Sequence, residues 1–320
     1  MFDVDDRGIR ISGTEFYLDA RKKTTLSFIS HAHSDHVRRH DKIIATPPTI
    51  SLVKSQNKKI NAIPLEYHEK YEVESLAIEL IPSGHILGSA QILIERNGLK
   101  LVYTGDFKPG NSETAEPLLV RRADILIMES TFGAPQYVFP QRWQVIEKLV
   151  KFIDKCFHSG IVPVVMGYAT GKAQEVLKIL GDLDYQVSIH ASIEPIVRIY
   201  GQYGVVFKNY QIYRGEDMRE RVLLIPPYLA RSHLVSNLWK TRKLILTGWA
   251  INPEAKYHYG ADEALAFSDH ADFNQLIAYV HQVQPTKIFI THGIESFIHY
   301  LRREGFKADL LEASSQISLF

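Results

Sequence analysis

The hydrophobic pattern changes character along the chain, and this change limits the fold more than any other feature. Roughly the first 130 residues contain short runs rich in β-branched residues and bounded by Gly, Pro, Asn or Asp, which predicts strands. From residue 141 onward, helix-like and strand-like runs alternate. The predicted helices span 141–160, 171–181, 192–204, 272–283 and 294–305. Such alternation is typical of βαβ units on a mostly parallel sheet, so the fold class is α/β.

Polar and histidine-bearing turns follow predicted strands in both the early and the late part of the sequence. We therefore predict one domain made of two halves, 1–134 and 266–320, that share a site. The α/β segment 135–265 is then an insertion into that domain.

Composition excludes several classes of protein and site. The 320 residues carry a formal net charge of +1, so no global field attracts a polyanion. The predicted insertion is mildly basic, with 16 Lys and Arg against 12 Asp and Glu between residues 134 and 265, a difference of +4. The single cysteine, Cys156, excludes an intramolecular disulfide and a thiolate zinc site. No apolar run approaches the roughly 18 residues of a membrane span, and the N-terminus is unlike a signal peptide, so we expect a cytoplasmic protein.

The segment HAHSDH places His31, His33, Asp35 and His36 directly after an apolar run. In an extended segment the first three of these side chains share one side, and His36 follows at once. Zinc is bound by imidazole and carboxylate groups and needs about four donors, so this density of ligands predicts a metal site. One such loop cannot complete two ions, and further ligands must come from elsewhere.

Single polar residues at other predicted strand ends are the candidates. His85 lies in SGHILG, Asp106 in YTGD and His292 in ITHG. Taken alone, each is more often a cap or a turn residue than a ligand, but together they complete two ligand sets. Asp19, in EFYLDA, is expected to orient a ligand histidine.

These motifs resemble the metallo-β-lactamase superfamily, whose fold is an αββα sandwich. DILIMESTFG with Glu129, FSDHADF with His270, and ITHG resemble its nucleic-acid-processing branch, the β-CASP nucleases, which carry an inserted α/β β-CASP domain. ESTFGAPQYVFP and YATGKAQEVL are similar to the ligase-associated DNA exonucleases, also described as mRNA 3′-end processing factor-like exonucleases.

The resemblance implies two zinc ions, with manganese as the alternative metal. His31, His33 and His85 would hold one ion, Asp35, His36 and His292 the other, and Asp106 would bridge them. The resemblance also makes Asp35, Glu129 and His270 catalytic, with Glu129 orienting or charging His270. From the residues alone, Glu129 would be an ordinary strand-end carboxylate and His270 a neighbour of a helix cap.

The function implied is a metal-dependent nuclease, most closely a DNA exonuclease of repair that associates with a ligase. An RNase, exo- or endonucleolytic, is the alternative, because Artemis-type DNA nucleases usually carry Val at the position of His292. A small-molecule metallohydrolase and a catalytically silent subunit of a processing complex are further alternatives. The inserted domain argues against the first, and the complete ligand set argues against the second.

The insertion also offers contacts for a polymer. Thr170, Gly171 and Lys172 precede or begin a predicted helix, where Thr170 would cap the helix and free N–H groups would bind a phosphate. A plain turn with a solvated lysine is the equally weighted alternative. Tyr168, Tyr257 and Tyr259 would stack on bases, although packing is the commoner role of such residues.

Overall fold

The computed structural model describes residues 1–56 and 59–311, and these form two compact units. The first comprises Met1–Tyr137 together with the chain from His270 onward, and the second spans Val138–Asp269. The sequence placed the two boundaries at 134/135 and 265/266. Each unit is described by itself.

Two β-sheets form the first unit. The first sheet has the strand order β1-β2-β3-β4-β5-β6 and the second has the order β19-β18-β11-β10-β9-β8-β7. The strands of the first sheet are β1 (Phe2–Asp5), β2 (Gly8–Ile11), β3 (Phe16–Leu18), β4 (Leu26–Phe28), β5 (Lys42–Ala45) and β6 (Ala62–Pro64). Those of the second are β7 (Lys70–Val73), β8 (Leu76–Pro82), β9 (Ala90–Arg96), β10 (Leu99–Tyr103), β11 (Ile125–Ser130), β18 (Lys287–Gly293) and β19 (Ala308–Leu310).

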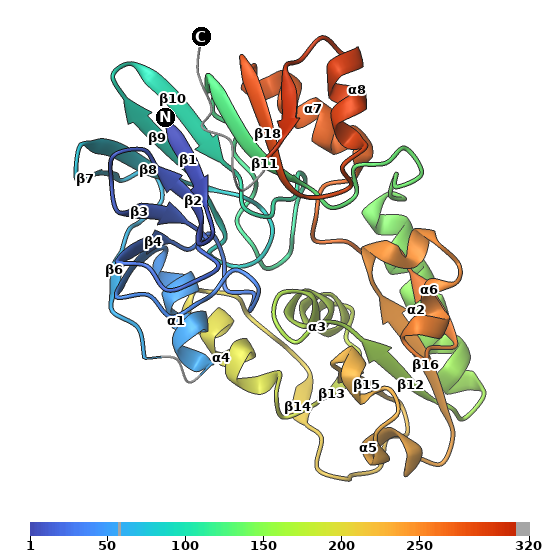
Figure 1. Ribbon diagram of the computed structural model, residues 1–320. Helices are drawn as coiled ribbons and strands as arrows, with labels where there is room; N and C mark the ends of the chain where they lie inside the picture. The colour runs from blue at the N-terminus through green and yellow to red at the C-terminus, as the bar shows by residue number, and fades with distance from the viewer. Residues whose placement is uncertain (57–58, 312–320) are drawn as a thin grey trace. The chain divides into compact units, whose positions relative to one another are not determined.

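Alternation along the strands gives the second sheet two apolar faces. In β11, Ile125 and Ile127 belong to the core that also contains Phe16 and Phe28 of the first sheet. Leu126 and Met128 face the other way, into a second core that includes residues of helices α7 (Phe273–Val283) and α8 (Phe297–Arg303). Figure 1 shows both helices beside β11 and β18. Helix α1 (Pro47–Ser55) contacts β6 of the first sheet. The layers are helix, sheet, sheet and helix, which confirms the predicted αββα sandwich.

The second unit is a six-stranded, wholly parallel sheet in the order β14-β13-β15-β12-β16-β17. Its strands are β12 (Val162–Met166), β13 (Gln186–Ile189), β14 (Tyr210–Ile212), β15 (Arg221–Ile225), β16 (Thr241–Leu246) and β17 (Glu263–Leu265). Its helices are α2 (Arg142–His158), α3 (Lys172–Asp182), α4 (Glu194–Gln202), η1 (Pro227–Leu229), α5 (His233–Ser236), η2 (Gly248–Ile251) and α6 (Ala255–His258). Burial of α2, α3 and α4 against β12, β13 and β15 forms its own core, as βαβ alternation predicts.

Helix α1 is an element that the sequence did not reveal. Its apolar positions include β-branched Thr49, Ile50 and Val53, which lower helix propensity and resemble a strand. Local chemistry nevertheless starts the helix, because the hydroxyl of Thr46 accepts a hydrogen bond from Thr49 N–H at 3.3 Å and a proline follows the cap. Burial of Ile50 and Val53 then outweighs their propensity. Among the helices of the described residues, none has the length and apolar composition to cross a bilayer.

Candidate metal centre

Strand direction explains why residues distant in sequence meet at one edge of the second sheet. Strand β9 is antiparallel to both β8 and β10, whereas β10, β11 and β18 are parallel to one another. Strands β8, β10, β11 and β18 therefore all end at the same edge. His85 follows β8, Asp106 follows β10, Glu129 lies near the end of β11, and His292 lies near the end of β18.

Glycines allow close approach of the backbone at this edge. Gly293 has φ +110°, and a Cβ there would lie 2.2 Å from the carbonyl carbon of Ser130, where β11 and β18 shift register. Gly84 has φ +78°, and its Cβ would lie 2.2 Å from the Lys108 oxygen. Only glycine accepts both the positive φ and the lack of space for a Cβ. Gly293 adjoins the candidate ligand His292, and Gly84 adjoins His85.

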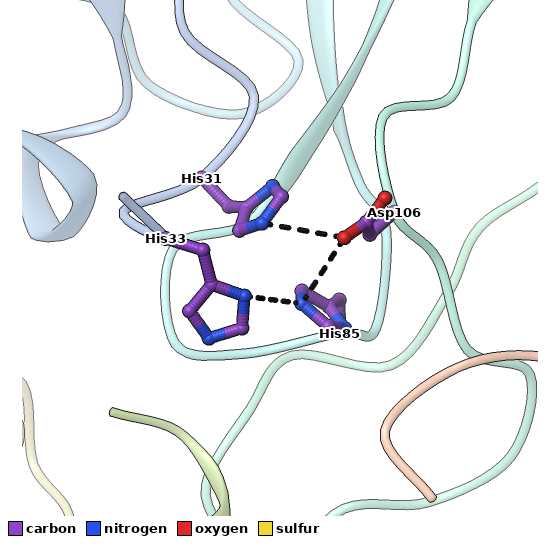
Figure 2. Close-up of side chains that lie close together, drawn as sticks. All are labelled: His31, His33, His85 and Asp106. Carbon is purple, nitrogen blue, oxygen red and sulfur yellow. Dashed lines mark hydrogen bonds and ion pairs between the residues drawn. The ribbon is translucent and has the colours of Figure 1, made fainter. Parts of the chain in front are cut away.

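The first ligand group consists of His31, His33, His85 and Asp106 (Figure 2). His85 Nε2 lies 3.1 Å from His33 Nδ1 and 3.7 Å from Asp106 Oδ2. His31 Nε2 lies 3.5 Å from the same Asp106 oxygen. The four ligand atoms lie within 4.8 Å of one another, which one ion could bridge.

The second group consists of His36, His292 and, again, Asp106. Asp106 Oδ1 is 3.2 Å from His292 Nε2, and Asp106 Oδ2 is 3.7 Å from His36 Nε2. The side chain of Asp106 is 6% exposed. A single buried carboxylate thus reaches both groups.

The donor set fits metal ions better than it fits a closed polar core. His31 Nε2 is buried without a hydrogen-bond partner among the described residues, although buried ring nitrogens are normally satisfied. Burial, followed by the charge of His36, holds the pKa of His31 well below its ordinary value, so this nitrogen offers a lone pair. Imidazole and carboxylate donors in this number suit zinc or a similar divalent ion.

Electrostatics keeps the central carboxylate ionised. Burial alone would favour the neutral acid, but the surrounding imidazoles, His36 first, hold the pKa of Asp106 well below its usual range. Burial likewise opposes the charged form of His36, yet the carboxylates of Asp106 and Asp19 raise its pKa to about 10. A buried carboxylate surrounded by imidazole nitrogens is the kind of site in which a divalent cation supplies the balancing positive charge.

Asp19 contacts the candidate ligand His36 directly and the candidate ligand His31 through Ser30. Its Oδ1 accepts a hydrogen bond from Ser30 N–H at 2.7 Å. Its Oδ2 accepts one from the Tyr103 hydroxyl at 2.8 Å and also lies 2.8 Å from His36 Nδ1. Ser30 Oγ in turn lies 3.0 Å from His31 Nδ1. These contacts occupy the Nδ1 atoms of His36 and His31, so Nε2 of each ring faces Asp106.

Glu129 and His270 form a close pair at the same edge. His270 Nδ1 lies 3.0 Å from both carboxylate oxygens of Glu129, which is 1% exposed. Glu129 also accepts hydrogen bonds from Phe107 N–H at 2.9 Å and from the Thr131 hydroxyl. Burial raises the pKa of Glu129, but His270 outweighs it and leaves the pKa lowered. The His270 ring lies 4.7 Å from that of His85, centroid to centroid, so the pair adjoins the first ligand group.

Asp35 lies differently from the other predicted ligands. Its side chain is 77% exposed, and its carboxylate lies 3.8 Å from His36 Nε2, outside both ligand groups.

The predicted phosphate contact at Lys172 needs correction. Lys172 is 2% exposed, and its ammonium group donates to Asp269 Oδ1 at 2.7 Å and to the Phe267 carbonyl at 3.2 Å. Gly171 occupies the N-cap position of α3 in place of Thr170, and its N–H donates to Gln174 Oε1 at 2.8 Å. Because a buried ammonium requires an anionic partner, Lys172 is paired with Asp269 inside the second unit and is not a solvated lysine.

Sequence reasoning missed Ser30 and Thr291, which contact the Nδ1 atoms of candidate ligand histidines, and Tyr103, which donates a hydrogen bond to Asp19. Thr291 Oγ1 lies 2.9 Å from His292 Nδ1, and Ser30 Oγ lies 3.0 Å from His31 Nδ1. The available signal was position, because each residue lies within one to three positions of a predicted ligand.

Comparison with known proteins agrees with this geometry. The sequence profile of the family described as "Zn-dependent metallo-hydrolase RNA specificity domain" matches residues 262–309. A crystal structure of a protein of unknown function from Enterococcus faecalis V583 shares the fold, with a TM-score of 0.63 and 15% sequence identity over 91% of this chain and 80% of that one.

Three curated relatives are similar in sequence. A "Probable DNA ligase" from Opitutus terrae is 35% identical over 98% of this chain, which spans only 31% of that protein's length. An "RNase J-like protein" from Methanocaldococcus jannaschii is 26% identical over 83% of this chain and 80% of its own length. "Cleavage and polyadenylation specificity factor 73" from Drosophila melanogaster is 23% identical over 80% of this chain and 45% of its own length. The chain belongs to the metallo-β-lactamase-fold nucleases of the β-CASP type, a family of metal-dependent hydrolases.

Proposed function

We propose that this protein hydrolyses phosphodiester bonds of DNA from an end, at a site that holds two zinc ions. One observation carries the proposal: a single buried carboxylate, Asp106, lies within reach of two separate histidine groups. A carboxylate shared in this way suits a pair of cations, and paired cations suit an anionic substrate.

Each ion has a distinct ligand set in this proposal. His31, His33 and His85 hold one ion, His36 and His292 hold the other, and Asp106 contacts both. Asp35 joins the second set by turning its exposed carboxylate towards His36. The second unit, residues 138–269, is the β-CASP domain, and manganese is the alternative metal.

The protein's own residues then divide the work of hydrolysis. When bound, the two ions supply positive charge against the phosphate and lower the pKa of an attacking water. Asp19 and Ser30 keep the ligand rings in one orientation. Glu129 holds Nδ1 of His270, which leaves Nε2 to give a proton to the departing oxygen.

The substrate is proposed from sequence similarity, not from the geometry of the site. The similarity to a "Probable DNA ligase" and the motifs shared with ligase-associated exonucleases favour DNA and an association with a ligase in repair. The alternative is an RNase. His292 favours it, as do the RNA-specificity profile over residues 262–309 and the similarity to RNase J-like proteins.

Hydrolysis of labelled polynucleotides by the zinc-loaded protein tests the proposal. Single- and double-stranded DNA and RNA, labelled at either end, should give a ladder with one of these substrates, and a chelator should abolish it. His270→Ala should keep the bound metal but slow cleavage by roughly 10²–10⁴-fold, because proton transfer is lost.

A matched control is His281→Ala, which removes a half-exposed histidine of α7 that lies outside every ligand group. This variant should retain both metal and activity. Full activity in His270→Ala, or no cleavage of any substrate by the zinc-loaded wild type, would contradict the proposal.

A further inference from the structure

The second unit exposes aromatic rings at one edge of its sheet. Tyr168 is 43% exposed, Tyr228 is 72%, Trp249 is 40% and Tyr257 is 68%. Large apolar side chains are exposed singly on most surfaces, but here four of them belong to loops that follow neighbouring strands. Their placement therefore needs a reason beyond chance.

Topology brings these loops to a common edge. Strands β15, β12 and β16 are adjacent and parallel, and they end at Ile225, Met166 and Leu246. Tyr228 lies in η1 after β15, Tyr168 follows β12, and Trp249 lies in η2 after β16. All three loops leave the carboxyl edge of the sheet (Figure 1).

This edge also contains the point where the order in which strands are added to the sheet reverses. From β12 the chain adds β13, β14 and β15 on one side, and then crosses to add β16 on the other side. In open parallel sheets, ligands bind outside the carboxyl ends of the strands at such a switch point. Tyr168 and its neighbours therefore lie where the fold favours a binding site.

Contacts join the loops that carry these rings. The hydroxyls of Tyr168 and Tyr259 lie 3.1 Å apart, which joins the loop after β12 to the end of α6. A Cβ at Gly260 would lie 3.0 Å from Arg231 Nε, so Arg231, which follows η1, packs along the same turn. Helix α6, which carries Tyr257, contacts η2, which carries Trp249.

Cations accompany the rings. Lys256 Nζ lies 5.0 Å from the centre of the Tyr257 ring, and the exposed Arg231 lies against Gly260. The same loops carry two exposed carboxylates, Glu254 and Asp262, and Asp262 lies directly before β17, away from the carboxyl edge. Flat rings with interspersed cations match a chain of bases joined by phosphates, since bases stack on aromatic side chains and phosphates pair with Lys and Arg.

We propose that Tyr168, Tyr228, Trp249 and Tyr257 form a stacking surface for the unpaired bases of a single-stranded polynucleotide. This inference rests on the proposed function and specifies its substrate as single-stranded. Every base has a stacking face, so the surface accepts DNA and RNA without reading sequence. A duplex, whose bases are already stacked on one another, gains nothing from it.

Binding of hydrolysis-resistant phosphorothioate strands, followed by fluorescence anisotropy, tests the inference on the full-length zinc-loaded protein. The probes are single-stranded poly-dT and poly-rU, the corresponding duplexes, and an abasic strand that has the same backbone without bases. Tyr228→Ala and Tyr257→Ala should each weaken single-strand binding by roughly 5- to 100-fold. Wild-type protein should bind the abasic strand more weakly than poly-dT, and neither alanine variant should alter duplex binding.

Two controls isolate stacking. Tyr228→Phe keeps the ring and should bind as the wild type does. Trp239→Ala removes a more exposed ring, 89% accessible, from the loop before β16 at the opposite edge, and should also leave binding unchanged. Unchanged single-strand binding in both tyrosine variants would overturn the inference, as would equal loss with Trp239→Ala or equal affinity for the abasic strand.

The outcomes also separate this inference from the proposed function. If the protein cleaves DNA or RNA but the tyrosine variants bind single strands as tightly as the wild type, only the stacking surface is contradicted. If binding depends on the rings but no strand is cleaved, only the nuclease proposal is contradicted. Absence of single-strand binding by the wild type would overturn the stacking surface.

Discussion

Replacing Glu129 with glutamine tests the acid–base pair with little disturbance of the fold. The amide oxygen of glutamine can still accept the hydrogen bond from Phe107 N–H, so the variant removes the charge and keeps the shape. Glu129 is 1% exposed, and both of its oxygens lie 3.0 Å from His270 Nδ1. We expect Glu129→Gln to slow turnover while the protein stays folded and retains metal.

The magnitude follows from the kind of contact that is lost. A hydrogen bond to a charged partner contributes about 1.5–3 kcal/mol, against about 1 kcal/mol for a neutral one. At about 1.4 kcal/mol per tenfold change in rate, complete loss of the hydrogen bond that stabilises the protonated His270 ring corresponds to a fall in kcat of roughly 10- to 150-fold.

Glu129→Ala is the matched contrast. It removes the acceptor as well as the charge, and leaves the buried Phe107 N–H unsatisfied at a cost of about 1–3 kcal/mol. Thermal unfolding should therefore distinguish the two variants, whereas their kcat values should be similar. Steady-state kinetics across pH, a melting curve and a metal analysis complete the assay.

Wild-type kcat in Glu129→Gln would refute the pairing role. Loss of metal from that variant would instead make Glu129 a ligand, since its carboxylate also lies close to Asp106 and His270.

Two further predictions concern other carboxylates. Asp19→Asn should weaken metal affinity by roughly 10–100-fold, because His36 loses the partner that orients it, and competition with a chromogenic chelator measures this; unchanged affinity would contradict the orienting role. In the second unit, burial of Glu216 is outweighed by hydrogen bonds from Arg214 N–H, Gln211 and Ser188, which lower its pKa to about 2. Because its folded pKa is depressed, the stability it adds is present above pH 4.5 and lost as pH falls towards 2. Urea unfolding should show a smaller loss over that range in Glu216→Gln, and an unchanged loss would count against the assignment.

Local patterns predicted most of the strands and the turns that carry the candidate ligands, whereas the αββα layers were expected from the family resemblance. The apolar run DILIMES predicts a strand, and in the structure its successive residues enter two different cores. The loop His31–His36 is conspicuous because so many imidazoles in six residues serve few purposes other than metal binding. The positions of His85, Asp106 and His292 at the ends of predicted strands indicated that the two halves of the domain share a site.

Tertiary contacts decided what the sequence could not predict. Lys172 resembles a solvated lysine at a helix start, but Asp269, nearly a hundred positions later, pairs with it inside the second unit. Tyr103 resembles an ordinary strand aromatic, and only folding brings its hydroxyl to Asp19. Helix α1 forms against its propensity because burial of its β-branched face decides the outcome.

Anomalous diffraction at the zinc edge, from crystals of the zinc-loaded protein, tests the central claim most directly. The account predicts two peaks, one beside His31, His33 and His85 and one beside His36 and His292, with Asp106 bonded to both at about 2.0–2.2 Å. A single peak, or an Asp106 carboxylate that touches neither ion, would contradict it.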